Sequence, residues 1–134
     1  MNTFTLIVQD ATQSQRFDAV SSFVGEDATG SFGIMAGHTR MITTLVIGLA
    51  RFKTGEDHWT YIAAPGAVVY FVDNTLTLST RHYLIDDDFN RISQALEDEL
   101  LAEEEKLRSM KESLHQMEDE ILKRLWEMGR KEHV

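Results

Sequence analysis

The hydrophobic pattern of this chain changes its period near residue 87, and that change constrains the fold more than any other feature. Before it, short runs rich in valine, isoleucine, threonine and aromatic residues are separated by turn residues, which is typical of β-strands. After it, apolar residues recur at three- and four-residue spacings, which is typical of a helix with one apolar face. The pattern therefore predicts two domains, residues 1–86 and residues 87–134.

The first domain is predicted to be an antiparallel β-sandwich. Its runs with strand composition are Thr3–Gln9, Arg16–Gly25, Thr43–Lys53, His58–Ala63, Ala67–Val72 and Thr75–Thr80. Leu76 and Leu78 alternate with hydroxyl residues, as on a half-buried strand. Turn residues such as Pro65-Gly66 and Asp73-Asn74 fall between the runs. Strands at this spacing, without helical patterns between them, predict a sandwich or barrel and hence an α+β chain.

The second domain carries one narrow apolar stripe. Its positions are Phe89, Ile92, Leu96 and Leu100, then Leu107, Met110, Leu114, Met117, Ile121, Leu125 and Met128. Asp86–Asp88 favour a helix start, and Gly129 suits a helix end. Glu103 takes a stripe position, yet no glycine or proline breaks the helix there. Two structures fit this pattern: a two-helix hairpin bent near Glu103–Glu105, or one long extended helix of about 63 Å.

Composition narrows the class of protein. The formal net charge of −9 argues against nucleic-acid partners and anionic membrane surfaces. The chain has no cysteine, so disulfides and thiolate metal sites are excluded. The N-terminal residues lack the pattern of a signal peptide, and no apolar window has the length of about 18 residues that a membrane span needs. We therefore expect a soluble, cytoplasmic protein.

No pattern predicts a catalytic or metal site. The acidic clusters lie on the helical surface rather than in a predicted cleft. No metal-ligand spacing is present among the histidines His38, His58, His82, His115 and His133. Neither a phosphate-binding glycine loop nor a nucleophile elbow occurs. We expect a non-catalytic protein without a metal or an obligatory cofactor.

The segment "GSFGIMAGHTRMITTL", from Gly30 to Leu45, is the most distinctive stretch of the first domain. Its glycines allow positive φ angles or close backbone approach, so Gly37 predicts a turn that ends a strand. The imidazole of His38 then points outward or onto a cap, or it simply hydrogen-bonds the turn. The segment and the strand runs after it resemble the epsilon subunit of rotary F-type ATP synthases. The matching positions are Gly30, Phe32, Gly33, Ile34, Gly37, His38 and Thr43.

The resemblance covers the whole chain, because that family also joins an N-terminal β-sandwich to a pair of C-terminal helices. Ser31, Ala36 and Thr39-Arg40 depart from the family pattern, which indicates a divergent bacterial branch. The resemblance implies a subunit of the central stalk that couples the gamma subunit to the membrane c-ring during ion-driven rotation. It would lie peripherally on the cytoplasmic side of the bacterial inner membrane. The residues implied at the gamma and c-ring contacts are Ala28, Gly30, Ser31, His38, Thr39, Arg40 and Thr43.

The resemblance also implies roles for the helical domain. An extended arm would inhibit ATP hydrolysis, with the basic residues Lys123, Arg124, Arg130 and Lys131 reaching the alpha/beta catalytic head. Some bacterial relatives bind ATP through an acid and an arginine at the start of the first helix, and Asp88 and Arg91 match that spacing. ATP is thus a weak regulatory ligand at most. The simpler interpretation of the same two residues is an i,i+3 ion pair at a helix start.

An unrelated β-sandwich adaptor that dimerises through a coiled-coil tail is the alternative. The run from Leu107 to Ile121 places apolar residues at heptad-like positions, which favours that reading. It covers only about two clean heptads before Arg124 takes the next apolar position. Purified size distinguishes the two readings, because a monomer disfavours the dimerising tail.

Overall fold

The computed structural model describes residues 2–55 and 58–132 of the chain, and the side chains of residues 2–55 and 58–130. The strands are β1 (Phe4–Gln9), β2 (Ser14–Asp27), β3 (Gly30–Ile34), β4 (Met41–Leu45), β5 (Gly48–Thr54), β6 (Trp59–Ala64), β7 (Ala67–Val72), β8 (Thr75–Thr80) and β9 (Leu84–Asp86). The helical segments are α1 (Phe89–Ala95), the π-helical segment η1 (Leu96–Leu101) and α2 (Ala102–Glu132). The α+β fold class is thus confirmed.

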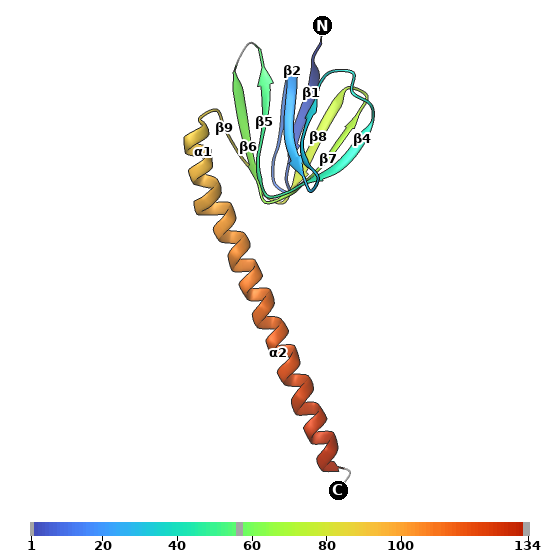
Figure 1. The fold of residues 1–134 in the computed structure, drawn as a ribbon, viewed down its shortest axis with the longest axis vertical. Helices are drawn as coiled ribbons and strands as arrows, with labels where there is room; N and C mark the ends of the chain where they lie inside the picture. Colours follow the sequence, from blue (N-terminus) through green and yellow to red (C-terminus); the bar gives the residue numbers. More distant parts are fainter. Residues whose placement is uncertain (1, 56–57, 133–134) are drawn as a thin grey trace. The chain divides into compact units, whose positions relative to one another are not determined.

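Strand β2 belongs to both layers of the sandwich. The strands follow the order β4-β7-β8-β1-β2-β5-β6-β9, with β3 paired to β2. The first half of β2 pairs with β1, and its second half pairs with β5 and β3. Between these halves Ala19 takes a φ of 60°, and the register with β5 shifts between Val20 and Ser22. This irregularity bends β2 from one layer into the other, as bulges do at sandwich corners. Figure 1 shows β2 between the two groups of strands.

The core consists of the inward residues of both layers. Burial alternates along β1, β7 and β8, so every second residue points inward. Phe23, Phe52 and Phe71 are fully buried, and Phe71 meets Phe4 edge to face at a centroid distance of 5.7 Å. Leu76 and Leu78 point inward, as the alternation predicts. Burial of these apolar side chains is the main favourable term that holds the sandwich together.

A second, smaller cluster covers part of the outer surface of the second layer. Ile92 in α1 and Leu100 in η1 are buried against Ala63 of β6, with Leu49 and Leu84 packed around them. Residues Met1–Leu101 accordingly form one compact unit, and Ala102–Val134 form another. Helices α1 and η1 therefore belong with the sandwich, whereas the change of hydrophobic period falls near residue 87. The division into domains 1–86 and 87–134 stays a prediction.

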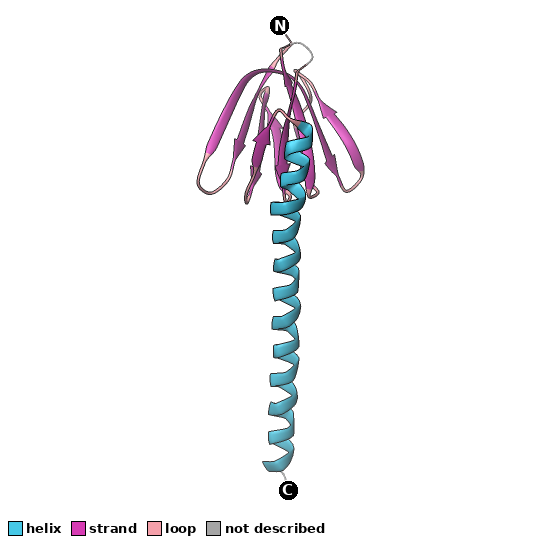
Figure 2. Cartoon of the chain, turned by 90° about the vertical axis from the view of Figure 1, so that its left-hand side faces the viewer, coloured by secondary structure: helices cyan, strands magenta, loops and turns pink. Residues whose placement is uncertain are grey.

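The strand predictions differ from the structure in two respects. Thr43–Lys53 is one run by composition, whereas the resemblance implies a strand, Gly48 and a second strand. The structure has two strands, β4 and β5, because the chain leaves the first layer at Leu45 and enters the second at Gly48. Strand β3 was expected only as the strand that the Gly37 turn ends, without bounds, and strand β9 was missed. In the helical region, Figure 2 colours the described residues after Asp88 as helix throughout. Helix α2 runs through Glu103–Glu105 without a break, so the structure has a long helix there and not the predicted bend at those residues.

We expect Ile92→Ala to lower the free energy of unfolding of the sandwich by about 2 to 4 kcal/mol, because Ile92 is 1% exposed and its removal leaves a cavity. Ile121→Ala is the matched control. Ile121 is 55% exposed, so the expected change is below about 0.5 kcal/mol. Urea unfolding followed by tryptophan fluorescence measures both. Equal effects of the two substitutions would show that α1 does not belong to the folded unit.

Candidate functional site

The glycine-rich segment forms strand β3 and the turn that follows it. The amide of His38 donates to the carbonyl of Met35 at 3.2 Å, which closes the turn. Gly37 has a φ of 78°, in the left-handed region that favours glycine. The exposed imidazole of His38 and the ring of Phe71 meet in a T-shaped arrangement, with their centroids 5.9 Å apart, and His38 Nδ1 lies 2.7 Å from the carbonyl oxygen of Thr39. The ring therefore caps the end of the core and also hydrogen-bonds the turn, so both predicted interpretations apply.

Asn74 joins this turn to the rest of the first layer. Its side-chain oxygen accepts a hydrogen bond from the Gly37 amide at 3.1 Å, and its side-chain nitrogen donates to the Thr3 carbonyl at 2.8 Å. Its own carbonyl accepts from the Thr5 amide at 3.2 Å. Asn74 also has a φ of 57°, a conformation that asparagine tolerates. One residue in the β7–β8 turn thus positions His38, Thr39 and Arg40.

Asp27 joins the β2–β3 turn to β4. Its Oδ1 accepts from the Thr29 amide at 2.8 Å and from the Thr29 hydroxyl at 2.5 Å, and its Oδ2 accepts from the Thr43 hydroxyl at 3.2 Å. These hydrogen bonds, led by that of the Thr29 hydroxyl, hold the pKa of Asp27 below its ordinary value. The structure thereby brings Thr43 close to the turn that carries Ala28, whose side chain is exposed.

Four strands of the first layer present an outer surface without charge. The first half of β2 beside them carries Arg16, which pairs with Ile7 of β1, and Asp18, which accepts a hydrogen bond from the Thr5 hydroxyl. Strands β1, β4, β7 and β8 contain no lysine, arginine, aspartate or glutamate, although 26% of the chain is charged. We call this surface the neutral face, and its outward residues are Thr5, Ile7, Gln9, Ile42, Thr44, Val68, Tyr70, Thr75, Thr77 and Ser79. Ile42 is 69% exposed and pairs across the strands with Tyr70. A neutral surface with exposed apolar side chains is typical of a protein interface.

The neutral face was not predicted from the sequence. The predicted contact residue Thr43 lies on β4, but its hydroxyl is bonded to Asp27, and its neighbours Ile42 and Thr44 are the exposed residues. A shallow hollow of about 530 Å³ lies at one end of the face, beside Val68 and Ser79. The absence of charge from all four strands is visible in the sequence, so a count of charges per strand would have found the face.

The predicted nucleotide residues come together as a helix cap. Asp88 accepts a hydrogen bond from the Arg91 amide at 3.0 Å, as an N-cap residue does. The Arg91 guanidinium instead pairs with Asp86, with Nη2 2.6 Å from Oδ1. This pairing lowers the pKa of Asp86 and raises that of Arg91. A nucleotide phosphate would have to displace Asp86 from Arg91, and ATP binding here stays a prediction.

The predicted regulatory residues lie on α2. Lys123 is exposed, Arg124 lies 3.8 Å from Glu120, and the Arg130 guanidinium stacks over Trp126 at 4.8 Å. The side chain of Lys131 lies outside the described residues. No described apolar side chain of α2 is buried, and Leu122 and Trp126 widen the predicted stripe. Among the described residues, no helix is long and apolar enough to cross a membrane.

These features define a class of protein: a β-sandwich binding module, with one neutral face, that carries a long amphipathic helix. The chain belongs to the ATP synthase delta/epsilon chain family, because residues 3–84 match the family's β-sandwich domain. The resemblance to epsilon subunits is confirmed by the relatives that the chain matches.

Two relatives illustrate this. The chain is 34% identical over 88 residues to an ATP synthase epsilon chain of Leptospira borgpetersenii, covering 66% of this chain and 66% of the relative. It is 30% identical over 80 residues to ATP synthase epsilon chain 2 of Cereibacter sphaeroides, covering 59% of this chain and 55% of the relative. The matched part thus spans between about half and two thirds of the relatives' length.

Solved structures share the fold. A chain of the mitochondrial ATP synthase of Euglena gracilis matches with a TM-score of 0.56 and 16% identity, covering 69% of this chain and 61% of that chain. A chain of the Tetrahymena thermophila mitochondrial ATP synthase central stalk and c-ring matches with a TM-score of 0.52 and 14% identity, covering 60% and 64%. At these identities the likeness concerns the fold alone.

We expect the stability of the chain to depend on the ionisation of Asp27. A carboxyl with a lowered folded-state pKa contributes stability above its unfolded pKa of about 3.9, and that contribution is lost as the pH falls through the folded pKa. Asp27→Asn should therefore lose less stability than the unsubstituted chain between about pH 6 and pH 2. Urea unfolding midpoints across that range measure the difference.

The matched control for this titration is Asp73→Asn, because the Asp73 carboxylate accepts no hydrogen bond from the described residues. The urea unfolding midpoints of Asp73→Asn should change with pH in the same way as those of the unsubstituted chain. Identical pH profiles for Asp27→Asn and Asp73→Asn would contradict the role given to the Thr29 and Thr43 hydrogen bonds.

Proposed function

We propose that this chain is a non-catalytic central-stalk subunit of an F-type ATP synthase or ATPase. It couples the gamma subunit to the membrane c-ring while ion flow drives rotation, and it lies peripherally on the cytoplasmic side of the bacterial inner membrane. Family membership and the names of the relatives support this proposal. The observation that most supports the proposal is the neutral face. A subunit held permanently against a partner needs a surface whose desolvation costs little free energy.

The neutral face is the proposed contact with gamma. Four strands of five or six residues form a patch of roughly 20 by 20 Å, since strands are about 4.8 Å apart and rise about 3.3 Å per residue. That area is about half of what one partner buries in a standard interface. The turn with His38, Thr39 and Arg40 supplies further area directly before β4, including Met35, which is 65% exposed.

The β2–β3 turn is the proposed contact with the c-ring. Ala28, Gly30 and Ser31 are small, so the backbone of this turn can approach a partner closely. Asp27 holds the turn in place through the hydrogen bonds from Thr29. A rigid turn loses little conformational entropy on binding, which favours a contact that must transmit torque.

Helix α2 is the proposed brake on ATP hydrolysis. Its apolar stripe has no partner within the described part of α2, so it is available to a surface in the alpha/beta catalytic head. Lys123, Arg124, Arg130 and Lys131 would contact acidic residues there. The alternative is an adaptor that dimerises through the same stripe. Sedimentation of the purified chain separates the two, because the adaptor requires a dimer.

We expect Ile42→Asp to abolish recovery of gamma with the tagged chain, because the substitution places an unpaired charge within the proposed neutral interface. Pull-down from the native host followed by protein identification measures this. Ser22→Asp is the matched control, since Ser22 faces outward on the second layer, and it should leave gamma recovery unchanged. Recovery of gamma with Ile42→Asp at the normal yield would remove the neutral face as the contact.

We expect truncation after Leu101 to raise the rate of ATP hydrolysis by the assembled complex severalfold while gamma is still recovered. The cut leaves Ile92 and Leu100 in place, so the sandwich unit keeps its second cluster. ATPase assays on complexes with the full and truncated chains measure the effect. An unchanged rate, with normal assembly, would show that α2 does not inhibit hydrolysis and would leave the coupling role intact.

A further inference from the structure

The second layer presents a group of cations and aromatic rings on the part of its outer surface that α1 and η1 leave open. Across strands β5 and β6, Lys53 pairs with Trp59 and Arg51 pairs with Tyr61. The Arg51 guanidinium lies 4.7 Å and the Lys53 ammonium 4.6 Å from the centre of the Trp59 ring. Among the described residues, no carboxylate forms an ion pair with either cation. Trp59 thus holds two cations whose charges are not neutralised by those residues.

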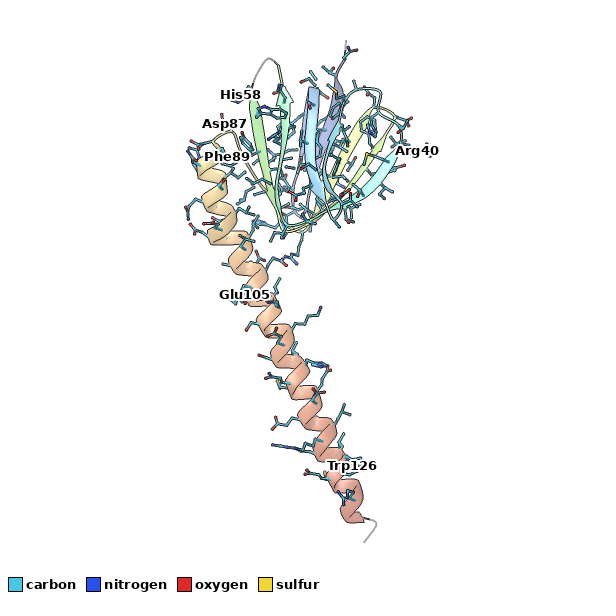
Figure 3. All side chains as sticks on the ribbon, in the orientation of Figure 1. Arg40, His58, Asp87, Phe89, Glu105 and Trp126 are labelled. Atoms are coloured by element: carbon cyan, nitrogen blue, oxygen red, sulfur yellow. The ribbon has the colours of Figure 1, made fainter. Side chains whose placement is uncertain are left out.

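A cleft of about 330 Å³ adjoins these cations. It is lined by Arg51, Tyr61, Phe89, Leu49, Val24 and Glu26, among others. The ring of Phe89 meets Tyr61 edge to face at 5.4 Å, yet Phe89 remains 53% exposed. Figure 3 places Phe89 on the opposite side of the sandwich from Arg40, so this surface is separate from the proposed gamma contact. An exposed phenylalanine at the rim of a partly apolar cleft indicates a binding surface.

We infer that this surface binds an acidic peptide segment of a partner protein, with carboxylates at Arg51 and Lys53 and an apolar side chain in the cleft beside Phe89. The inference does not depend on the proposed function. Two cations that form no ion pair with a described carboxylate, in a chain with a net charge of −9, favour an anionic partner. Arginine, tryptophan and tyrosine are also the residues that contribute most to protein interfaces.

The geometry favours a peptide over a nucleotide. A base would need an open aromatic face for stacking, but the Trp59 ring already contacts Arg51 and Lys53. A carboxylate needs only the outward N–H groups of the two cations, which remain available while their other sides contact the ring. Holding Arg51 on Trp59 also reduces the conformational entropy that binding costs.

Glu26 determines which end of the cleft receives the carboxylates. It pairs across the strands with Ser31, and both line the cleft with Arg51. Its carboxylate repels a second acid, so the acidic part of the peptide should lie over Arg51 and the apolar part between Leu49 and Phe89. Replacing Glu26 by glutamine should therefore strengthen binding rather than weaken it.

The test uses the full chain with Trp126→Phe, which leaves Trp59 as its remaining tryptophan. The probe is a synthetic peptide of repeated Glu-Glu-Leu units. Its addition should change the fluorescence of Trp59 saturably, because Arg51 and Lys53 shift toward the carboxylates. The affinity should fall as salt is raised, as expected for partly exposed charge pairs. Peptides of Gln-Gln-Leu and Glu-Glu-Ser units should bind more weakly, since they lack the charges and the apolar side chain respectively.

Arg51→Gln should lower the affinity by about tenfold. Arg16→Gln is the matched control, because Arg16 is an exposed arginine on β2 that pairs with Asp18, and it should change the affinity by less than about twofold. Glu26→Gln should raise the affinity. Thermal unfolding of each variant confirms that it folds, because all three residues are exposed.

Four results would overturn the inference. The first is the absence of a saturable fluorescence response, and the second is a loss of peptide affinity with Arg16→Gln equal to that with Arg51→Gln. The third is Arg51-dependent binding of ATP or of phosphatidylglycerol vesicles that is tighter than binding of the peptide. The fourth is peptide binding that occurs only after truncation at Leu101, which would identify this chain's own helix as the occupant. The inference is supported if Arg51→Gln weakens peptide binding while Arg16→Gln leaves it unchanged.

Discussion

The sandwich depends on one strand that serves both of its layers. Two separate sheets would each present an edge, but β2 pairs with β1 through its first half and with β5 and β3 through its second. The change of direction is accommodated by the positive φ of Ala19 and the shifted register at Val20. Because β2 is continuous, the inward residue Phe23 packs in the same core as Phe71 from the other layer. Both outer surfaces are consequently held in a fixed relation to one another.

The two outer surfaces differ in chemistry because different elements cover them. Neither α1 nor η1 packs on the first layer, where β1, β4, β7 and β8 carry no charge and apolar residues such as Ile42 and Tyr70 are exposed. The second layer is partly covered by Ile92 and Leu100, and the uncovered part carries Arg51 and Lys53. One surface can therefore bind a neutral partner permanently, while the other suits an anionic partner that associates reversibly and in a salt-dependent manner.

Most of the fold followed from periodicity, whereas the elements that were missed or predicted without bounds lack a local signal. Strand β3 contains two glycines in five residues and forms because β2 offers it a full set of pairing positions. Strand β9 has three residues and depends on β6 in the same way. The roles of Asn74 and Asp27 could not be predicted, because each bonds residues far away in the sequence. The pairing of Arg91 with Asp86 rather than Asp88 depends on the path of the chain between β9 and α1, which the spacing of charges does not determine.

Helix α2 combines an exposed apolar face with an uneven distribution of charge. Most helical stability in proteins comes from burial of an apolar face, yet the described apolar side chains of α2 remain exposed. Leu122 and Trp126 extend the apolar face near the end of the helix, close to Lys123 and Arg124. The partner proposed for this end of the helix would therefore need a surface that is both apolar and acidic. The amino-terminal part of α2, which begins with Glu103, Glu104 and Glu105, has the opposite charge and would be repelled by the same surface. In the proposed role as a brake, this charge distribution favours entry into such a surface with the carboxyl end of α2 leading.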